Sequence, residues 1–186
     1  MSSSYTDSLK LEKQATGANA NTWGNNTNNN LEVVDSFNSG YLSKSVAGSA
    51  DVTLTTANAD PDAESSNKVI EFTGTLTGNI KVFVPAVENN YIFFNNTAGS
   101  FTLTVAPTGH AANGVAIAKG AHTIQYCKGN RIVDLFASSF GNISAKTQIK
   151  IGDNVKLNAN GVVQATTLLG NGAGLSGVEE FAAGTK

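Results

Sequence analysis

Two short segments carry residue types and spacings that ligand-binding loops use, and the first is rich in glycine. Residues 172–177, Gly-Ala-Gly-Leu-Ser-Gly, match the Gly-x-Gly-x-x-Gly pattern of dinucleotide-binding turns. That chemistry needs a strand before the turn, a helix after it and an acidic residue further along a βαβ unit. Only nine residues follow Gly177. We therefore interpret this segment as a turn, and we predict no bound nucleotide.

The second segment is acidic. Asp60, Asp62, Glu64 and Glu71 stand at positions 1, 3, 5 and 12 of a stretch that resembles a calcium-binding loop in its spacing. The sixth position is Ser65, where such a loop requires glycine for its sharp turn. Glu71 also falls in a predicted strand. A solvated acidic loop between strands is the preferred interpretation, and we predict no metal.

Residues suited to catalysis or zinc binding are few and unfavourably spaced. His110 and His122 are the only histidines and Cys127 is the only cysteine, so no internal disulfide can form. Their spacing matches no common zinc motif. No Gly-x-Ser-x-Gly elbow is present, and no pair of carboxylates stands out for acid–base work. We expect surface histidines, a packed thiol, no catalytic site and no cofactor.

Bulk properties exclude several partners. The chain has 186 residues and a formal net charge of -2, and 14% of its residues are charged. Without a basic stripe to neutralise phosphates, nucleic-acid binding is not expected. The sequence has no apolar run long enough for a membrane span and no secretory signal at its start. We expect synthesis in a cytosol and no membrane insertion.

Residues 143–169 form the most regular pattern in the chain. Apolar and polar side chains alternate there, which is typical of short strands with one buried face. The apolar side chains are small or β-branched, so a ribbon this thin cannot bury them against itself. Either the preceding domain or identical ribbons from other chains must cover them. We favour a homotrimer in which five residues form the core: Ile149, Ile151, Val155, Leu157 and Val163.

The sequence predicts β structure over residues 50–140, before the ribbon. Candidate strands separated by turn residues recur at roughly ten-residue spacing, as in sandwiches and barrels. We expect about eight strands that form an all-β, antiparallel β-sandwich over residues 50–140. The candidates are residues 52–55, 69–73, 80–84, 91–94, 101–105, 115–117, 122–127 and 131–136.

The N-terminal 45 residues are polar and rich in asparagine, and they contain the only tryptophan, Trp23. We predict one short helix over residues 31–38, with Asn30 as its N-cap and Gly40 just after its end. A large aromatic in a polar arm usually anchors that arm on a neighbouring surface. The predicted docking residues are Trp23, Leu31, Val34 and Phe37.

Three groups of residues carry a resemblance to a known class of proteins. Leu11-Glu-Lys-Gln-Ala-Thr-Gly17, with Thr22-Trp-Gly24 and Leu31-Glu-Val-Val-Asp35, resembles the N-terminal module of marine bacteriophage structural proteins. Residues 68–78, 82–85 and 126–130 resemble the β domain that often follows that module. Gly170-Asn-Gly-Ala-Gly-Leu-Ser-Gly-Val178 is similar to a glycine-rich signature of phage tail fibres. Together these motifs span most of the chain.

The resemblance implies a virion component, namely a trimeric short tail fibre or a fibre adaptor. Residues 1–45 would dock on another virion protein, and residues 50–140 would be displayed. The glycine-rich signature lies in the C-terminal part, residues 141–186. No large receptor-binding tip follows it here, which favours a short fibre, a connector or a capsid-surface decoration. In an alternative hypothesis the β domain adheres to host surface glycan through Tyr91, Phe93 or Tyr126. The third and least favoured hypothesis is an enzyme that cleaves polysaccharide.

Overall fold

The computed structural model describes residues 2–135, and the structural statements below concern that part of the chain. Every described residue belongs to one compact unit of the chain, Met1–Ile143. This part is mostly β structure with a single α-helix, which confirms the expected all-β class. The predicted ribbon lies outside the described residues, and with it lie the five predicted trimer-core residues: Ile149, Ile151, Val155, Leu157 and Val163.

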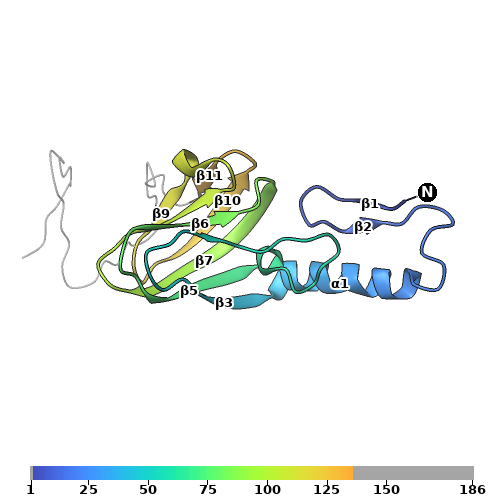
Figure 1. Ribbon diagram of the computed structural model, residues 1–186, viewed down its shortest axis with the longest axis horizontal. Helices are drawn as coiled ribbons and strands as arrows, with labels where there is room; N and C mark the ends of the chain where they lie inside the picture. Colours follow the sequence, from blue (N-terminus) through green and yellow to red (C-terminus); the bar gives the residue numbers. More distant parts are fainter. Residues whose placement is uncertain (1, 136–186) are drawn as a thin grey trace, which may run out of the picture. The chain divides into compact units, whose positions relative to one another are not determined.

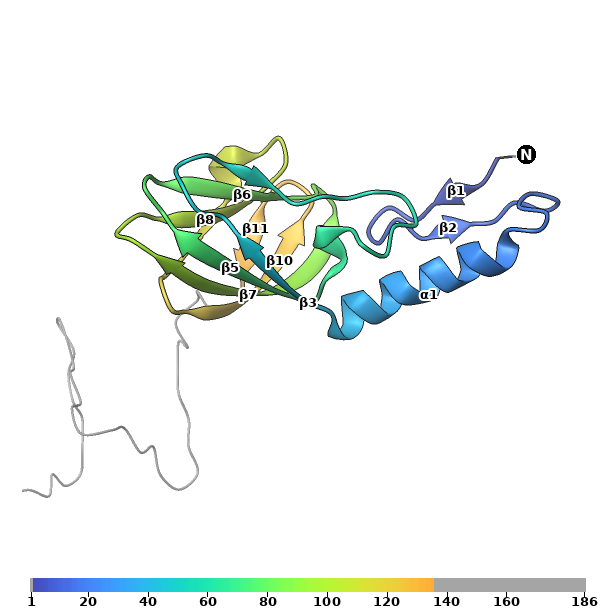
Figure 2. The same cartoon turned by 60° about the horizontal axis from the view of Figure 1, so that its bottom comes forward.

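The chain begins with a small hairpin followed by the helix. Strands β1 (Ser4–Tyr5) and β2 (Glu12–Lys13) pair antiparallel, and α1 runs from Trp23 to Ser39. The helix therefore begins eight residues earlier than predicted, and its N-cap position is Thr22, so the prediction of Asn30 as the cap is wrong. The helix ends at Ser39, one residue after the predicted end, and Gly40 follows it directly. Figure 2 shows the helix leading directly into β3.

Tertiary contacts explain the early start of the helix. Asparagine disfavours helix interiors because its amide competes for backbone hydrogen bonds. Here the Asn30 amide instead bonds the backbone of β2: its Oδ1 accepts from the Glu12 N–H at 2.8 Å, and its Nδ2 donates to the Glu12 carbonyl at 2.9 Å. The hairpin thus gives this side chain partners outside the helix and allows residues 23–30 to remain helical.

The larger of the two main sheets has five strands, in the order β11-β10-β7-β5-β3 (Figure 1). The sequence predicted the position of each of them except β3, although β7 extends well beyond its predicted ends. Their bounds are Tyr41–Ser45 for β3, Val69–Thr75 for β5, Glu88–Ala98 for β7, His122–Lys128 for β10 and Ile132–Asp134 for β11.

The second sheet has four strands, in the order β4-β6-β8-β9. Strands β6 and β9 have the predicted bounds, whereas β8 begins at Leu103 and leaves Phe101 exposed outside the strand. Two short 3-10 helices lie in the connections, η1 (Glu64–Ser66) and η2 (Ala111–Asn113). The strand bounds are Val52–Thr53 for β4, Ile80–Val84 for β6, Leu103–Pro107 for β8 and Val115–Ile117 for β9.

The prediction of antiparallel sheets is wrong for the centre of both. Strands β3, β5 and β7 pair parallel in one sheet, and β4, β6 and β8 pair parallel in the other. The chain alternates between the sheets from β3 to β8, so each strand returns beside its predecessor in the same direction. Val69 pairs with Ile92 and Ile80 with Leu103, so both strands recur after 23 residues.

The winding ends after β8. Strand β9 turns back antiparallel to β8, and β10 and β11 pair antiparallel along the free side of β7. At one corner of the winding, Gly99 has a φ of +94°, and a side chain there would place Cβ 2.5 Å from the Leu76 carbonyl oxygen. Glycine lets the two successive turns of chain approach this closely.

One buried cluster contains side chains from both sheets. The five-stranded sheet contributes Ile70, Phe72, Tyr91, Phe93, Cys127 and Ile132, and the four-stranded sheet contributes Ile80, Val82, Val84, Leu103, Val105 and Ile117. Phe93 lies near the middle of this cluster, with its ring stacked on Phe72 at 5.5 Å and on Tyr91 at 5.1 Å. The two sheets therefore share one core, which holds their strands in fixed register.

Candidate functional site

The predicted docking residues lie on α1. Trp23, Leu31 and Val34 are 65%, 62% and 43% exposed, which is unusual for large apolar side chains in a polar segment. Trp23 and Val34 are eleven residues apart, about three helical turns, so they lie in line along one face. Leu31 is on the adjoining strip. We call Trp23, Leu31 and Val34 the α1 apolar surface, and their role in docking stays a prediction.

The fourth predicted docking residue, Phe37, has a different environment. Its ring is half-buried, and the Lys68 Nζ lies 5.0 Å from the ring centroid, within range of a cation–π interaction. The Lys68 backbone N–H also donates to the Ser36 carbonyl at 3.1 Å. These contacts tie the end of α1 to the segment that leads into β5. Phe37 thus has a packing role within the chain, in contrast to the three exposed residues.

The start of α1 is held by the N-terminal arm. Gln14 Nε2 donates to the Thr27 hydroxyl at 3.1 Å, and the Asn30 amide holds the Glu12 backbone as described above. Asn19 Nδ2 donates to the Glu12 carboxylate at 2.7 Å. These polar side chains therefore have structural partners within the chain, whereas the α1 apolar surface stays exposed.

The acidic residues of the calcium-like spacing do not form a shared site. Glu64 pairs with Lys44, and its second oxygen accepts from the Thr55 N–H at 3.0 Å. Glu71 lies on β5, where it accepts hydrogen bonds from Tyr41 on β3 and Asn96 on β7. Among the described residues, no group of three or more His, Cys, Asp or Glu is arranged to hold a metal ion.

These bonds change the acidity of both carboxyl groups. Burial raises the pKa of Glu64, but the bonds from Lys44 and Thr55 outweigh burial and leave the pKa below its usual value. The pKa of Glu71 is lowered by its bonds from Tyr41 and Asn96. Both groups therefore favour the ionised form in the folded chain and act as structural acceptors.

The remaining candidate side chains are separated by the fold. The ring of His122 is exposed and stacks on Phe94, with centroids 3.9 Å apart and an interplanar angle of 8°. His110 is exposed at the start of η2. Cys127 is buried in the core, and burial raises the pKa of its thiol. Two exposed histidines and a packed thiol match the expectation for these residues.

The aromatic platform considered for glycan binding is wrong for two of its three members. Tyr91 and Phe93 are 0% exposed and belong to the shared core. The Tyr91 hydroxyl accepts from Asn89 Nδ2 at 3.0 Å, and burial raises the Tyr91 pKa well above its usual value. Tyr126 is half-buried on the opposite face of the sheet. Successive side chains of β7 point to opposite faces of the sheet, but the sequence pattern alone does not indicate which of the two faces is buried.

The outer face of the five-stranded sheet carries an apolar row that sequence reasoning missed. In register across β3, β5, β7 and β10 lie Tyr41, Val69, Ile92 and Ile124, and the Leu135 N–H donates to the Ile124 carbonyl at 3.0 Å. Tyr41 and Leu135 are more than half exposed, and the other three are half-buried. Neighbouring strands bring these residues together, although the first and last of them, Tyr41 and Leu135, are 94 residues apart in the sequence.

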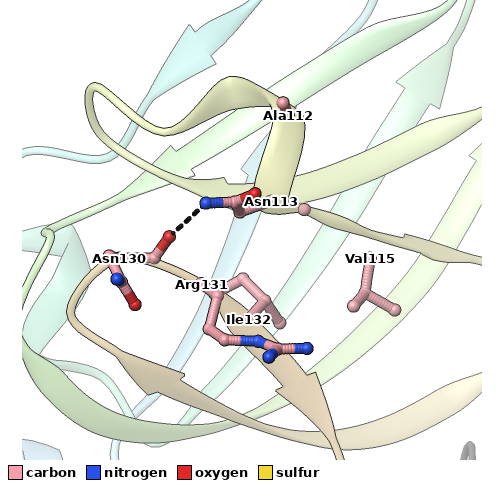
Figure 3. Close-up of a pocket in the computed structure, with 7 residues that line it drawn as sticks. Ala112, Asn113, Val115, Asn130, Arg131 and Ile132 are labelled. Atoms are coloured by element: carbon pink, nitrogen blue, oxygen red, sulfur yellow. Dashed lines mark hydrogen bonds between the residues drawn. The ribbon is translucent and has the colours of Figure 1, made fainter.

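A pocket of about 510 Å³ opens between the η2–β9 segment and the turn that joins β10 to β11 (Figure 3). Its lining includes the amides of Asn113 and Asn130 and the guanidinium of Arg131, the only arginine in the sequence. Asn113 Nδ2 donates to the Asn130 carbonyl at 2.8 Å and so links the two walls. The sequence indicated a turn at 128–130 and a resemblance over 126–130, but it did not indicate a pocket there. The single arginine, next to Asn130, was the one sequence feature that could have indicated a binding site there.

Comparison with known proteins identifies no relative. No family model, no curated protein and no solved structure matches this chain. Within the described residues, no helix is long and apolar enough to cross a membrane. Function must therefore be inferred from the α1 apolar surface, the pocket and the sequence motifs.

Proposed function

We propose that this chain is a non-enzymatic structural component of a bacteriophage virion, a trimeric short tail fibre or a fibre adaptor. Its role would be mechanical: one end docks on the particle and the other displays a β domain at the surface. The virion would be its final location, after assembly in the cytoplasm of the host cell. The motifs shared with phage structural proteins suggest this class.

The α1 apolar surface is the observation that carries the docking part of the proposal. Exposed apolar side chains that lie close together mark surfaces where proteins bind one another, and tryptophan is enriched among the residues that contribute most to such binding. Here they lie on a 17-residue helix whose start is held by the arm, so the surface is preorganised for binding. Trp23 would act as the main anchor on another virion protein.

Assembly is assigned to the C-terminal ribbon. We propose that the two described sheets act as a β-sandwich in each chain and that three ribbons associate around a threefold axis. The alternating apolar residues Ile149, Ile151, Val155, Leu157 and Val163 would form a dry core between them. Few charges interrupt that set, as self-association requires.

The experiment that tests assembly is the mass of the full chain in solution, measured by light scattering. We expect a trimer for the natural sequence and a monomer for the double variant Ile151→Asp with Val155→Asp, because two carboxylates would enter the apolar set. The matched control, Gln148→Asp with Lys156→Asp, changes the polar set of the same ribbon and should leave a trimer. A natural chain that is monomeric would contradict the proposal.

Two alternatives use the same chain differently. As a capsid-surface decoration, the chain would keep the same docking helix and trimer but bind a capsid protein; purified tails and purified capsids, tested separately for binding, distinguish the two. As a host-adhesion module, the β domain would bind surface glycan. Since Tyr91 and Phe93 are buried, Tyr126 alone remains of the predicted aromatic platform, and the Arg131 pocket is the observation that favours adhesion.

A further inference from the structure

The pocket described above contains a positive charge that the described part of the chain does not neutralise. Lys44 and Glu64 form an ion pair, and neither of these two residues lines the pocket. No carboxylate is among the lining residues, so Arg131 faces the pocket without an acidic partner there. A guanidinium presents planar N–H donors that match the two oxygens of a carboxylate.

Polar groups beside Arg131 supply further hydrogen bonds. Asn113 uses one N–H of its amide to hold the Asn130 carbonyl, which leaves its Oδ1 and its second N–H without a partner among the described residues. The Asn130 side chain is exposed at the pocket and bonds no described residue. An amide carries both an acceptor and donors, so the pair can bond neighbouring hydroxyl groups in either direction.

One wall of the pocket is apolar and rigid. Ile132 belongs to the shared core and is 3% exposed, and Val115 packs partly against the same core. Between Asn113 and Val115, Gly114 lies so close to β8 that an added Cβ would be 2.6 Å from the Val105 carbonyl oxygen. Figure 3 shows the Arg131 side chain running past Ile132, with Val115 beyond it. This arrangement offers a planar cation and amides beside a small apolar patch.

A sugar acid has the complementary features. Its carboxylate fits a guanidinium, its adjacent hydroxyls fit amide groups, and the C–H face of its ring fits a small apolar patch. The volume of about 510 Å³ lies within the usual range for small-ligand pockets. A phosphate site would more often present a glycine-rich loop or several cations, and this lining has a single cation.

We propose that the Arg131 pocket binds a carboxylate-bearing sugar, of the uronic acid type, in a glycan on the host surface. Arg131 binds the carboxylate, Asn113 and Asn130 bind hydroxyl groups, and the half-buried Val115 side chain contacts the ring. This inference rests on the host-adhesion alternative above and names its site and its ligand class. It is independent of the ribbon and of the α1 apolar surface.

The test measures binding of the full-length chain to a galacturonic acid trisaccharide by titration calorimetry at physiological salt. The neutral galactose trisaccharide with the same linkage serves as the matched ligand. We expect the acidic trisaccharide to bind at least tenfold more tightly, because charge-assisted bonds to arginine are about twice as strong as neutral ones. Inorganic phosphate, added as a competitor at equal concentration, should displace little of the sugar.

Four variants locate the site. Arg131→Ala should weaken acidic-sugar binding at least tenfold, and Arg131→Lys should recover only part of it because lysine lacks the planar fork. Ala112→Glu adds a carboxylate to the exposed rim and should repel the acidic sugar. Lys128→Ala removes a cation of the same hairpin outside the lining and should change affinity less than twofold. Thermal denaturation checks that each variant is folded.

Four outcomes would overturn the inference. Equal affinity for the acidic and neutral trisaccharides would show that the carboxylate of the sugar does not contribute to binding. An equal loss in Lys128→Ala and Arg131→Ala, or full displacement by phosphate, would indicate a non-specific electrostatic attraction. Acidic-sugar binding that persists in Arg131→Ala would place adhesion elsewhere on the chain; the host-adhesion alternative would then survive, and only this pocket would be excluded.

Discussion

The inner face of β7 and the exposed face of α1 both present large aromatic side chains, yet they have opposite physical roles. On β7, Phe93 and Tyr91 are fully buried between the two sheets. On α1, Trp23 is 65% exposed beside Leu31. Burial of the first pair stabilises the fold through the hydrophobic effect, whereas the second pair leaves apolar area in water, where we propose that it binds a partner. An aromatic residue of this chain is therefore a candidate for binding only where the fold leaves it exposed.

The largest expected effect is on the buried side. Phe93→Ala should lower the free energy of unfolding by about 3–5 kcal/mol, because it removes a fully buried ring and leaves a cavity against Phe72 and Tyr91. Urea denaturation followed by circular dichroism measures the change. Phe101→Ala, at a ring that is 45% exposed, is the control and should cost about 0.5 kcal/mol or less. A Phe93→Ala variant as stable as the control would show that the buried Phe93 ring does not stabilise the fold more than an exposed ring does.

The next effect concerns the backbone that lets the chain wind between the sheets. Gly99→Ala should cost about 1–3 kcal/mol through strain at its positive φ, plus the clash with the Leu76 carbonyl. Gly109→Ala is a matched control, since Gly109 has a φ of +77° and no atom within 4 Å of an added Cβ. The difference in melting temperature between the two variants measures the clash alone. Equal destabilisation would mean that the two turns of chain separate at low cost.

A smaller effect follows from Glu64, which joins the segment before β5 to β3. Because the folded-state pKa of Glu64 lies below its usual value of 4.5, its bonds stabilise the fold above that pH. The contribution should disappear as the pH falls from about 4.5 through the folded-state pKa. The side chain is 18% exposed, and we expect about 0.5–1 kcal/mol at neutral pH.

Chemical denaturation between pH 3 and 7 measures this contribution. Glu64→Gln should lose the stability at neutral pH and show a flatter profile below pH 4.5 than the natural chain. Glu88→Gln removes an exposed carboxylate at the start of β7 and serves as the control. Identical pH profiles for Glu64→Gln and the natural chain would show that the Lys44 and Thr55 contacts contribute nothing.

The smallest effect on stability is expected at the exposed aromatic. Trp23→Ala should change the free energy of unfolding by about 0.5 kcal/mol or less. Its ring is mostly solvated, and the hydrogen bonds that its backbone carbonyl accepts from Thr27 and Gln14 do not depend on the side chain. Binding to virion particles in a co-sedimentation assay should fall sharply, whereas Asn25→Ala, at an exposed polar position of the same helix, should bind normally. A clear loss of stability in Trp23→Ala would show that Trp23 is part of the core.

Local patterns in the sequence located most of the β structure but not its pairing. Strands β6 and β9 were predictable to the residue because alternating or β-branched side chains lie between clear turn signals. The parallel arrangement was not predictable. The pairing sense depends on which sheet the chain enters after each turn, and alternation within one strand carries no information about that. The first turn of the winding, from β3 to β5, also spans 28 residues instead of 23, which hides the repeat.

The candidate sites divide in the same way. Trp23 was expected in the arm before the helix, whereas the placement of Leu31 and Val34 on one helix was predictable, because spacing alone sets the face there. The helix start was not, because the Asn30 amide depends on β2 for its partners. The Arg131 pocket was not either, since its walls come from 112–115 and 130–132, and nothing local indicates that these segments meet.

By itself the sequence determined the β-rich class, the positions of most strands, the exposed side chains of α1 and the alternating set at 143–169. These depend on interactions between residues close in the chain, for which spacing and side-chain type are sufficient. Only the tertiary structure decided the parallel winding, the burial of Tyr91 and Phe93, and the meeting of Asn113 with Arg131. Each of these depends on which distant segments lie side by side, and that is settled when both sheets bury their apolar faces in one shared core.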